Sequence, residues 1–171
     1  MSPRLLIVLC LLPLLAACGF QLRGSYGIDE RLQPMYIAAG GEFGHALTNE
    51  LERGGIDLTA DRNTAASVLE VIERHRDRRV LAIAEDGRAD EYEILYTVDW
   101  RLLAGDGADS GDALIAATRH SARDAYIFDP GRRLAADAEE EVLEERIRAE
   151  VAERILRRIE AWSPSEDVSD D

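Results

Sequence analysis

The stretch "EYEILYTVDWRL", Glu91–Leu102, decides the fold class of this chain. Every second residue is apolar or aromatic, and the set is Tyr92, Ile94, Tyr96, Val98, Trp100 and Leu102. The positions between them are mostly polar: Glu91, Glu93, Leu95, Thr97, Asp99 and Arg101. A period of two over this length is typical of an antiparallel strand with one buried face. At ~3.3 Å per residue the strand would be about 40 Å long, so we expect a long sheet with one covered face.

Three further segments are predicted to be strands of the same sheet. Residues 67–84 are rich in Val, Ile, Leu and Arg and precede a turn at "EDGR", Glu85–Arg88. Leu114–Tyr126 is a weaker strand, for which we expect one side to carry Ile115, Ala117, Arg119, Ser121 and Arg123. Pro34–Ala39 is a short strand that ends at Gly40-Gly41.

Two amphipathic helices are predicted to cover the sheet. Phe43, Leu47 and Leu51 share one helical face, and Gly54-Gly55 ends that helix. The second helix runs over roughly Leu134–Trp162, with an apolar stripe of Leu143, Ile147, Val151, Ile155, Ile159 and Trp162. Three Glu-to-Arg pairs at i, i+4 support it: 144–148, 150–154 and 153–157. The order β-α-β-β-β-α predicts an α+β two-layer sandwich, with two helices packed on one face of a largely antiparallel, mixed four-stranded sheet.

The N-terminus has the layout of a secretory signal. Arg4 is followed by an apolar run, Leu5–Leu15, that is too short to span a bilayer. The run ends in Leu15-Ala16-Ala17-Cys18, which resembles the lipobox of bacterial lipoproteins; the alternative is an ordinary signal with a chance cysteine. We expect 1–17 to be removed, 18–33 to be a lipidated tether, 34–162 to be one domain and 163–171 to be a disordered acidic tail.

The predicted lipid is covalent, an acyl and diacylglyceryl modification of Cys18, and we expect no other cofactor. Cys10 lies in the segment that is removed, so no disulfide is expected. Gly19 stands where, in enterobacterial lipoproteins, an Asp favours retention in the inner membrane, so this resemblance suggests the outer membrane.

Charge excludes two classes of partner. The chain has 20 basic residues, all arginine, against 34 acidic ones, and a formal net charge of −14. Proteins that bind nucleic acid carry a basic face, and electrostatic docking on an anionic membrane needs a basic patch. We therefore expect no nucleic-acid partner and a membrane attachment made by lipid alone.

No segment has the pattern of a catalytic or metal site. His45, His75 and His120 lie on separate elements without metal-ligand spacing. The stretch "GDGADSGD", Gly105–Asp112, lacks the ligand positions of a calcium loop and is interpreted as solvated. We therefore expect neither catalysis nor a bound metal.

One basic row stands out in this acidic chain. Arg74, Arg76 and Arg78 alternate, so an extended strand would present them on one face and Arg79 on the other. Guanidinium groups match phosphate bidentately, so the row is a candidate site for a phosphorylated glycolipid. The alternative is an edge strand protected from aggregation by charge. Arg132 and Arg133 form a second, smaller candidate.

Several motifs together resemble the LPS-assembly lipoprotein family, LptE (RlpB-like). "LAACGFQLRG", Leu15–Gly24, is similar to the family's mature N-terminus. Ala89, Glu91 and Tyr92 match its A-x-E-Y pattern after the central turn. Residues 123–159 resemble its last strand and C-terminal helix. Family members often carry basic residues at the hairpin tip and before that helix; here those places read "AEDGR" and "LAADAEEE", with Arg88 the only cation.

The resemblance implies an outer-membrane lipoprotein that faces the periplasm. It would pair as a plug with the LptD β-barrel, assist assembly of that barrel and bind lipopolysaccharide. The candidate phosphate contacts are then Arg74, Arg76, Arg78, Arg88, Arg132 and Arg133, and the candidate barrel contacts are Thr97 and Asp99 on the polar face of the sheet. The rival interpretation is a free-standing periplasmic lipoprotein that binds a small ligand or an envelope protein.

Overall fold

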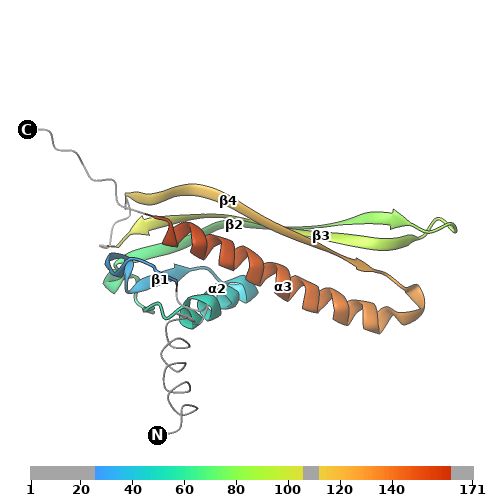
Figure 1. Ribbon diagram of the computed structural model, residues 1–171, viewed down its shortest axis with the longest axis horizontal. Coiled ribbons are helices and arrows are strands. Elements are labelled where there is room, and N and C mark those ends of the chain that lie inside the picture. Colours follow the sequence, from blue (N-terminus) through green and yellow to red (C-terminus); the bar gives the residue numbers. More distant parts are fainter. Residues whose placement is uncertain (1–25, 106–111, 163–171) are drawn as a thin grey trace, which may run out of the picture.

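The computed structural model describes residues 26–105 and 112–162, and it has the predicted order of elements (Figure 1). The strands are β1 (Met35–Ala38), β2 (Ser67–Ile83), β3 (Ala89–Ala104) and β4 (Ala113–Ile127). The helices are α2 (Gly41–Arg53) and α3 (Arg133–Glu160). Short 3-10 turns lie at Glu30–Leu32, Arg62–Thr64 and Pro130–Arg132.

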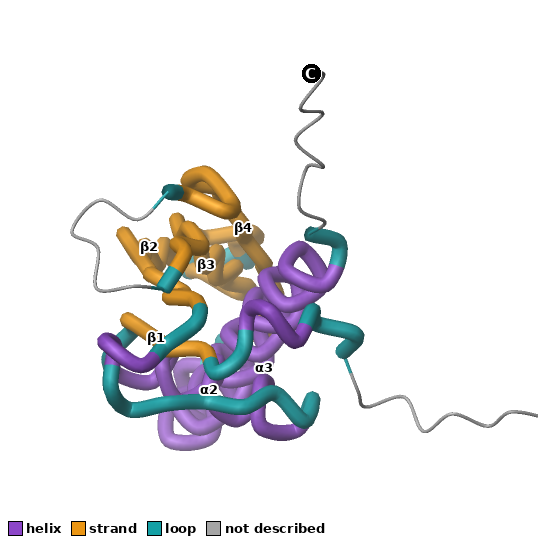
Figure 2. Tube along the Cα trace, turned by 90° about the vertical axis from the view of Figure 1, so that its left-hand side faces the viewer, coloured by secondary structure: helices purple, strands orange, loops and turns teal. Residues whose placement is uncertain are grey.

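The four strands form one mixed sheet in the order β1-β2-β3-β4. β1 runs parallel to β2, and the other two pairs are antiparallel. Both helices lie on the same side of the sheet (Figures 1 and 2), which confirms the two-layer α+β sandwich. β1 pairs with β2 over Ser67–Glu70. The rest of β2 therefore forms an edge of the described sheet and extends with β3 well beyond α2.

The apolar core lies between the sheet and the helices. The β3 residues predicted to face inward do so, and Ile94, Val98, Trp100 and Leu102 are fully buried. α2 contributes Phe43, Leu47 and Leu51, as its spacing predicts, and α3 contributes Leu143, Ile147, Val151, Ile155 and Ile159. Trp162 continues the α3 stripe and donates its indole N–H to the carbonyl of Leu114 over 3.0 Å. All three predicted Glu-to-Arg pairs of α3 form.

The expected faces of β4 were wrong at its start. Ile115 pairs with Leu102 and Thr118 pairs with Trp100, because the register shifts between these positions. A bulge adds one residue to a strand and so exchanges the faces on its two sides. Ile115 is therefore buried against the helices, whereas Arg119 is exposed beside Asp99 on the open face of the sheet.

Several expectations concern residues outside the described ranges. Cys18, the signal segment 1–17, the tail 163–171 and the centre of the "GDGADSGD" loop belong to this group. Among the described residues, neither α2 nor α3 has an apolar stretch that could cross a membrane.

Candidate functional site

The predicted arginine row points toward the helix layer. Arg74, Arg76 and Arg78 lie opposite Val98, Tyr96 and Ile94, which belong to the inward face of β3. Arg79 lies opposite Glu93 on the other face and forms an ion pair with it over 2.7 Å. The predicted division of the four arginines between two faces is therefore confirmed.

Arg76 is paired with two carboxylates of α3. Its Nε donates to Glu144 Oε1 over 2.6 Å, and its Nη2 donates to Glu140 and lies 2.5 Å from Glu144 Oε1. Burial lowers the pKa of the guanidinium, but Glu144 and Glu140 outweigh burial and raise that pKa above its usual value. Arg76 thus joins β2 to α3 across the two layers.

The neighbouring groups complete a cluster that we call the clamp: Arg76, Arg78, Tyr126, Glu140 and Glu144. The Arg78 guanidinium lies 3.9 Å from the ring centre of Tyr92 and 3.6 Å from Glu140 Oε2. The Tyr126 hydroxyl donates to Glu140, and burial together with this carboxylate raises the pKa of Tyr126. Every member of the clamp is thus engaged by another member.

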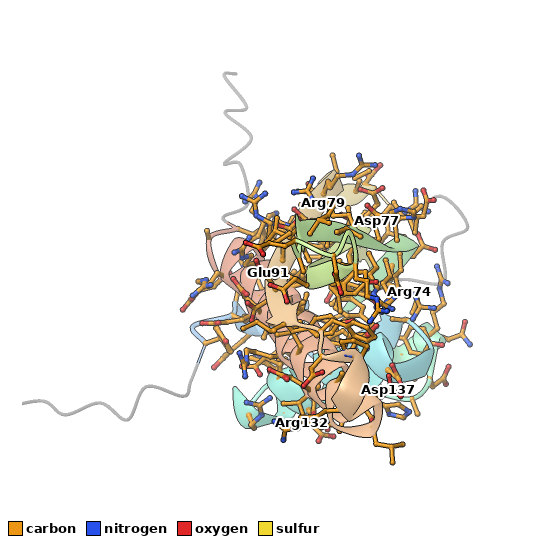
Figure 3. The ribbon with its side chains drawn as sticks, turned by 90° about the vertical axis from the view of Figure 1, so that its right-hand side faces the viewer. Arg74, Asp77, Arg79, Glu91, Arg132 and Asp137 are labelled. Carbon is orange, nitrogen blue, oxygen red and sulfur yellow. The ribbon has the colours of Figure 1, made fainter. Side chains whose placement is uncertain are left out.

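Arg74 lies outside the clamp, although it belongs to the same row. Its guanidinium donates to the carbonyl of Gly40, the residue that precedes α2. Figure 3 shows Arg74 between the sheet and the helix layer, with Arg79 and Asp77 on the sheet side.

An acidic hollow of about 350 Å³ opens beside the clamp. Its lining consists of Glu42 from α2, Arg78 from β2, and Asp137, Glu140, Glu141, Glu144 and Arg148 from α3. Five carboxylates therefore face two guanidinium groups. In this arrangement an approaching phosphate meets net negative charge.

The other candidate cations do not join the row. Arg88 lies in the exposed β2–β3 turn, where its Nε is 3.6 Å from a carboxylate oxygen of Asp86. Arg132 is exposed immediately before α3, and Figure 3 shows it far from Arg79. Arg133 is the first residue of α3. The six candidate phosphate contacts thus lie in three separate places.

Thr97 and Asp99 lie on the open face of the sheet, away from the helices. Together with Glu73, His75 and Arg119 they line a hollow of about 210 Å³. Arg119 donates to both carboxylate oxygens of Asp99 over 2.7 Å, and this guanidinium lowers the pKa of Asp99. The face is polar, as predicted; its contact with a partner stays a prediction.

Sequence reasoning missed one polar contact inside the core. The indole N–H of Trp100 donates to His120 Nδ1 over 2.8 Å, and Trp100 is fully buried. Burial, then the charges of Arg154 and Arg158, lower the pKa of His120. No sequence signal pairs residues on two strands before their register is known. Among the described residues, no group of His, Cys, Asp and Glu is arranged to hold a metal ion.

Comparisons with known proteins agree with this architecture. The family model LptE, Lipopolysaccharide-assembly, matches residues 32–159. The chain is similar to the LPS-assembly lipoprotein LptE of Photorhabdus laumondii, with 24% identity over 93% of this chain and 87% of the relative. It is 25% identical to the protein of the same name from Pectobacterium atrosepticum, over 90% and 82% of the two chains.

A solved structure has the same fold over most of its length. The solution structure of an uncharacterized lipoprotein B from Nitrosomonas europaea has a TM-score of 0.66 and 25% identity, covering 84% of this chain and 91% of that one. The family model spans all four strands and α2, and it covers α3 except for its last residue. The chain belongs to the LptE, lipopolysaccharide-assembly, family.

Proposed function

We propose that this chain is a lipopolysaccharide-assembly lipoprotein of the bacterial outer membrane that pairs one-to-one with the LptD barrel as its plug. The observation that carries the proposal is the family match over residues 32–159, which includes every described strand, α2, and α3 except for its last residue. The relatives from Photorhabdus and Pectobacterium, which the chain matches over most of its length, are named LPS-assembly lipoproteins. The proposal includes no catalytic step.

The two faces of the sandwich support a plug. One face of the sheet is covered by α2 and α3, and the other carries the charged groups Glu73, Asp99 and Arg119 around a shallow hollow. The lumen of an outer-membrane barrel is polar, so this mostly polar face can lie against it with little apolar surface buried. Most antiparallel sheets also have a polar face that meets water, so the polar face alone does not favour the plug; membership of the LptE family is what supports it.

The length of the molecule fits a barrel that crosses a membrane. α3 has 28 residues, which corresponds to about 42 Å of helix. A bilayer with its headgroups is roughly 40–45 Å thick. A plug of this length would extend through most of the barrel.

Crosslinking tests the pairing directly. A photo-crosslinker at Thr97 or Asp99 in native outer membranes should capture LptD in a one-to-one adduct. A crosslinker at Glu52, which is exposed on α2, is the control. It lies on the helix side of the sheet, so it measures crosslinking that does not involve the open face. Adducts only with soluble periplasmic proteins would refute the plug and favour the free-standing binder.

The lipid anchor is a separate part of the proposal. Mass spectrometry of the membrane form should show a chain that begins at Cys18 and carries acyl and diacylglyceryl groups. Replacing Cys18 by Ala should release the protein from the membrane without changing its circular dichroism spectrum, because the substitution leaves the described core residues, from Ile28 to Ile159, unchanged. An unmodified thiol, or a chain that begins elsewhere, would contradict this anchor.

Lipopolysaccharide is the proposed cargo. Its phosphates would be contacted by arginines among Arg74, Arg76, Arg78, Arg88, Arg132 and Arg133. Charge-assisted hydrogen bonds of this kind contribute about 1.5–3 kcal/mol each before screening. Replacing Arg74, Arg76 and Arg78 by Gln should weaken the binding of lipopolysaccharide and reduce its dependence on salt. If the variant folds and binds lipopolysaccharide as the wild type does, these arginines do not contact the ligand.

A further inference from the structure

The contact between the two layers changes its chemistry along the length of α3. Near its C-terminal end the helix packs through fully buried apolar side chains, including Val151, Ile155 and Ile159. Near its N-terminal end the helix contacts the sheet through the polar and charged side chains of the clamp instead. From Leu134 to Leu143 only Ala136 and Leu143 are buried, and Leu134 is 88% and Val142 58% exposed.

The first part of α3 is therefore attached to the sheet mainly by ion pairs between side chains. We call residues 133–144 the strap. Three ion pairs join it to β2: Arg76 with Glu140, Arg76 with Glu144, and Arg78 with Glu140. Partly exposed ion pairs are weak compared with a packed apolar core. Segments with few buried apolar contacts are those that open locally without global unfolding.

Aromatic and cationic groups lie together under the strap. Tyr92 stacks on Tyr126 with ring centres 5.9 Å apart and meets Phe128 edge-on at 5.4 Å. The Arg78 guanidinium covers the Tyr92 ring, and Arg76 follows on the same face of β2. Guanidinium groups beside aromatic rings suit a ligand that joins phosphate to an apolar body.

Opening the strap would also invert the local charge. Four of the five carboxylates that line the acidic hollow belong to α3: Asp137, Glu140, Glu141 and Glu144. They move with the helix, whereas Arg76 and Arg78 stay on β2. The closed arrangement thus repels an anion that the open arrangement would attract.

We propose that Glu140 and Glu144 are internal competitors for an anion at Arg76 and Arg78, so that the strap must lift before a phosphorylated lipid binds on the clamp side of the sheet. This inference rests on the proposed function, since it assigns the phosphate of the cargo to two of the six candidate arginines. It adds that the position of α3 controls the access of the phosphate to these two arginines.

Two matched double variants test the competition. Glu140→Gln with Glu144→Gln removes both competing charges and keeps the side-chain size. Glu139→Gln with Glu145→Gln removes the same charge from exposed positions of the same helix that form no ion pair with the row. The whole chain is purified in detergent, and binding of bisphosphorylated lipid A is measured by calorimetry, with monophosphorylated lipid A and inorganic pyrophosphate as further probes.

The first double variant should bind lipid A about tenfold more tightly than the second. Adding Arg76→Gln and Arg78→Gln should abolish that gain. Hydrogen exchange at residues 133–144 should be faster in the first variant than in the second. Equal gain for pyrophosphate and lipid A would identify the phosphate alone as the ligand chemistry, and a smaller gain for pyrophosphate would show that the aromatic groups contribute.

Two results would overturn the proposal. Equal affinities of the two double variants for lipid A would show that only the net charge of the helix matters, not competition by Glu140 and Glu144. Unchanged hydrogen exchange at residues 133–144 would show that the clamp does not hold the strap. If the wild-type chain captures LptD but no variant binds lipid A, the competition fails while the plug stands. If it neither captures LptD nor binds lipid A, the proposed function fails first.

Discussion

Replacing His120 by Ala should destabilise this protein, because the substitution removes the hydrogen-bond acceptor of Trp100. His120 Nδ1 accepts a hydrogen bond from the indole N–H of Trp100 over 2.8 Å, and Trp100 is a fully buried residue of β3. In the Ala variant this buried N–H loses that acceptor. A buried donor left unsatisfied costs about 1–3 kcal/mol, so we expect a loss of this size in the free energy of unfolding at neutral pH.

The same contact makes stability depend on pH. Burial and the charges of Arg154 and Arg158 hold the folded-state pKa of His120 below its ordinary value of 6.5. In the unfolded chain the imidazole therefore takes up a proton at a higher pH than in the folded protein. The stabilising contribution is fully present above pH 6.5 and is lost as the pH falls through the lowered folded-state pKa.

His120→Gln separates the two effects, because a glutamine carbonyl can accept from Trp100 but does not titrate. Urea unfolding followed by circular dichroism, at about pH 7.5 and about pH 5.5, gives the free energies on both sides of an ordinary histidine pKa. The Gln variant should lose less stability between the two conditions than the wild type. Equal losses for wild type and His120→Gln would refute the reasoning.

Two further predictions concern packing. Ile155→Ala on the fully buried side of α3 should cost about 2–5 kcal/mol in urea unfolding, whereas Leu134→Ala, 88% exposed, should stay within about 0.5 kcal/mol; similar losses at both positions would contradict the described burial. Gly44→Ala should destabilise by about 1–3 kcal/mol, because its Cβ would lie 2.5 Å from the carbonyl oxygen of Ala39. His45→Ala on the exposed side of the same helix should be neutral or slightly stabilising, and a thermal melt in which Gly44→Ala gains stability would refute the clash.

Periodicity in the sequence was sufficient to predict the elements and the fold class. The alternation from Tyr92 to Leu102 and the i, i+4 spacing of Phe43, Leu47 and Leu51 are local patterns that the chain must satisfy to bury one face. The turn at Glu85–Arg88 and the two-layer arrangement follow from the same patterns. The motifs at the N-terminus, hairpin and last helix were sufficient to identify the family.

Tertiary structure alone decided what the arginine row touches. Strand alternation places Arg74, Arg76 and Arg78 on one face, but it cannot say whether that face meets water or α3. The answer depends on how α3 crosses the sheet, 60 to 70 residues later in the chain, where Glu140 and Glu144 reach Arg76.

Register decided the rest. A bulge moved Ile115 into the core and left Arg119 on the open face, and the pairing of β3 with β4 placed His120 beside Trp100. Such contacts join residues that have no relation in local sequence. The periodicity and composition of a sequence report on residues that are close along the chain. Ion pairs and buried hydrogen bonds depend on distances between residues that come together only after the layers have packed.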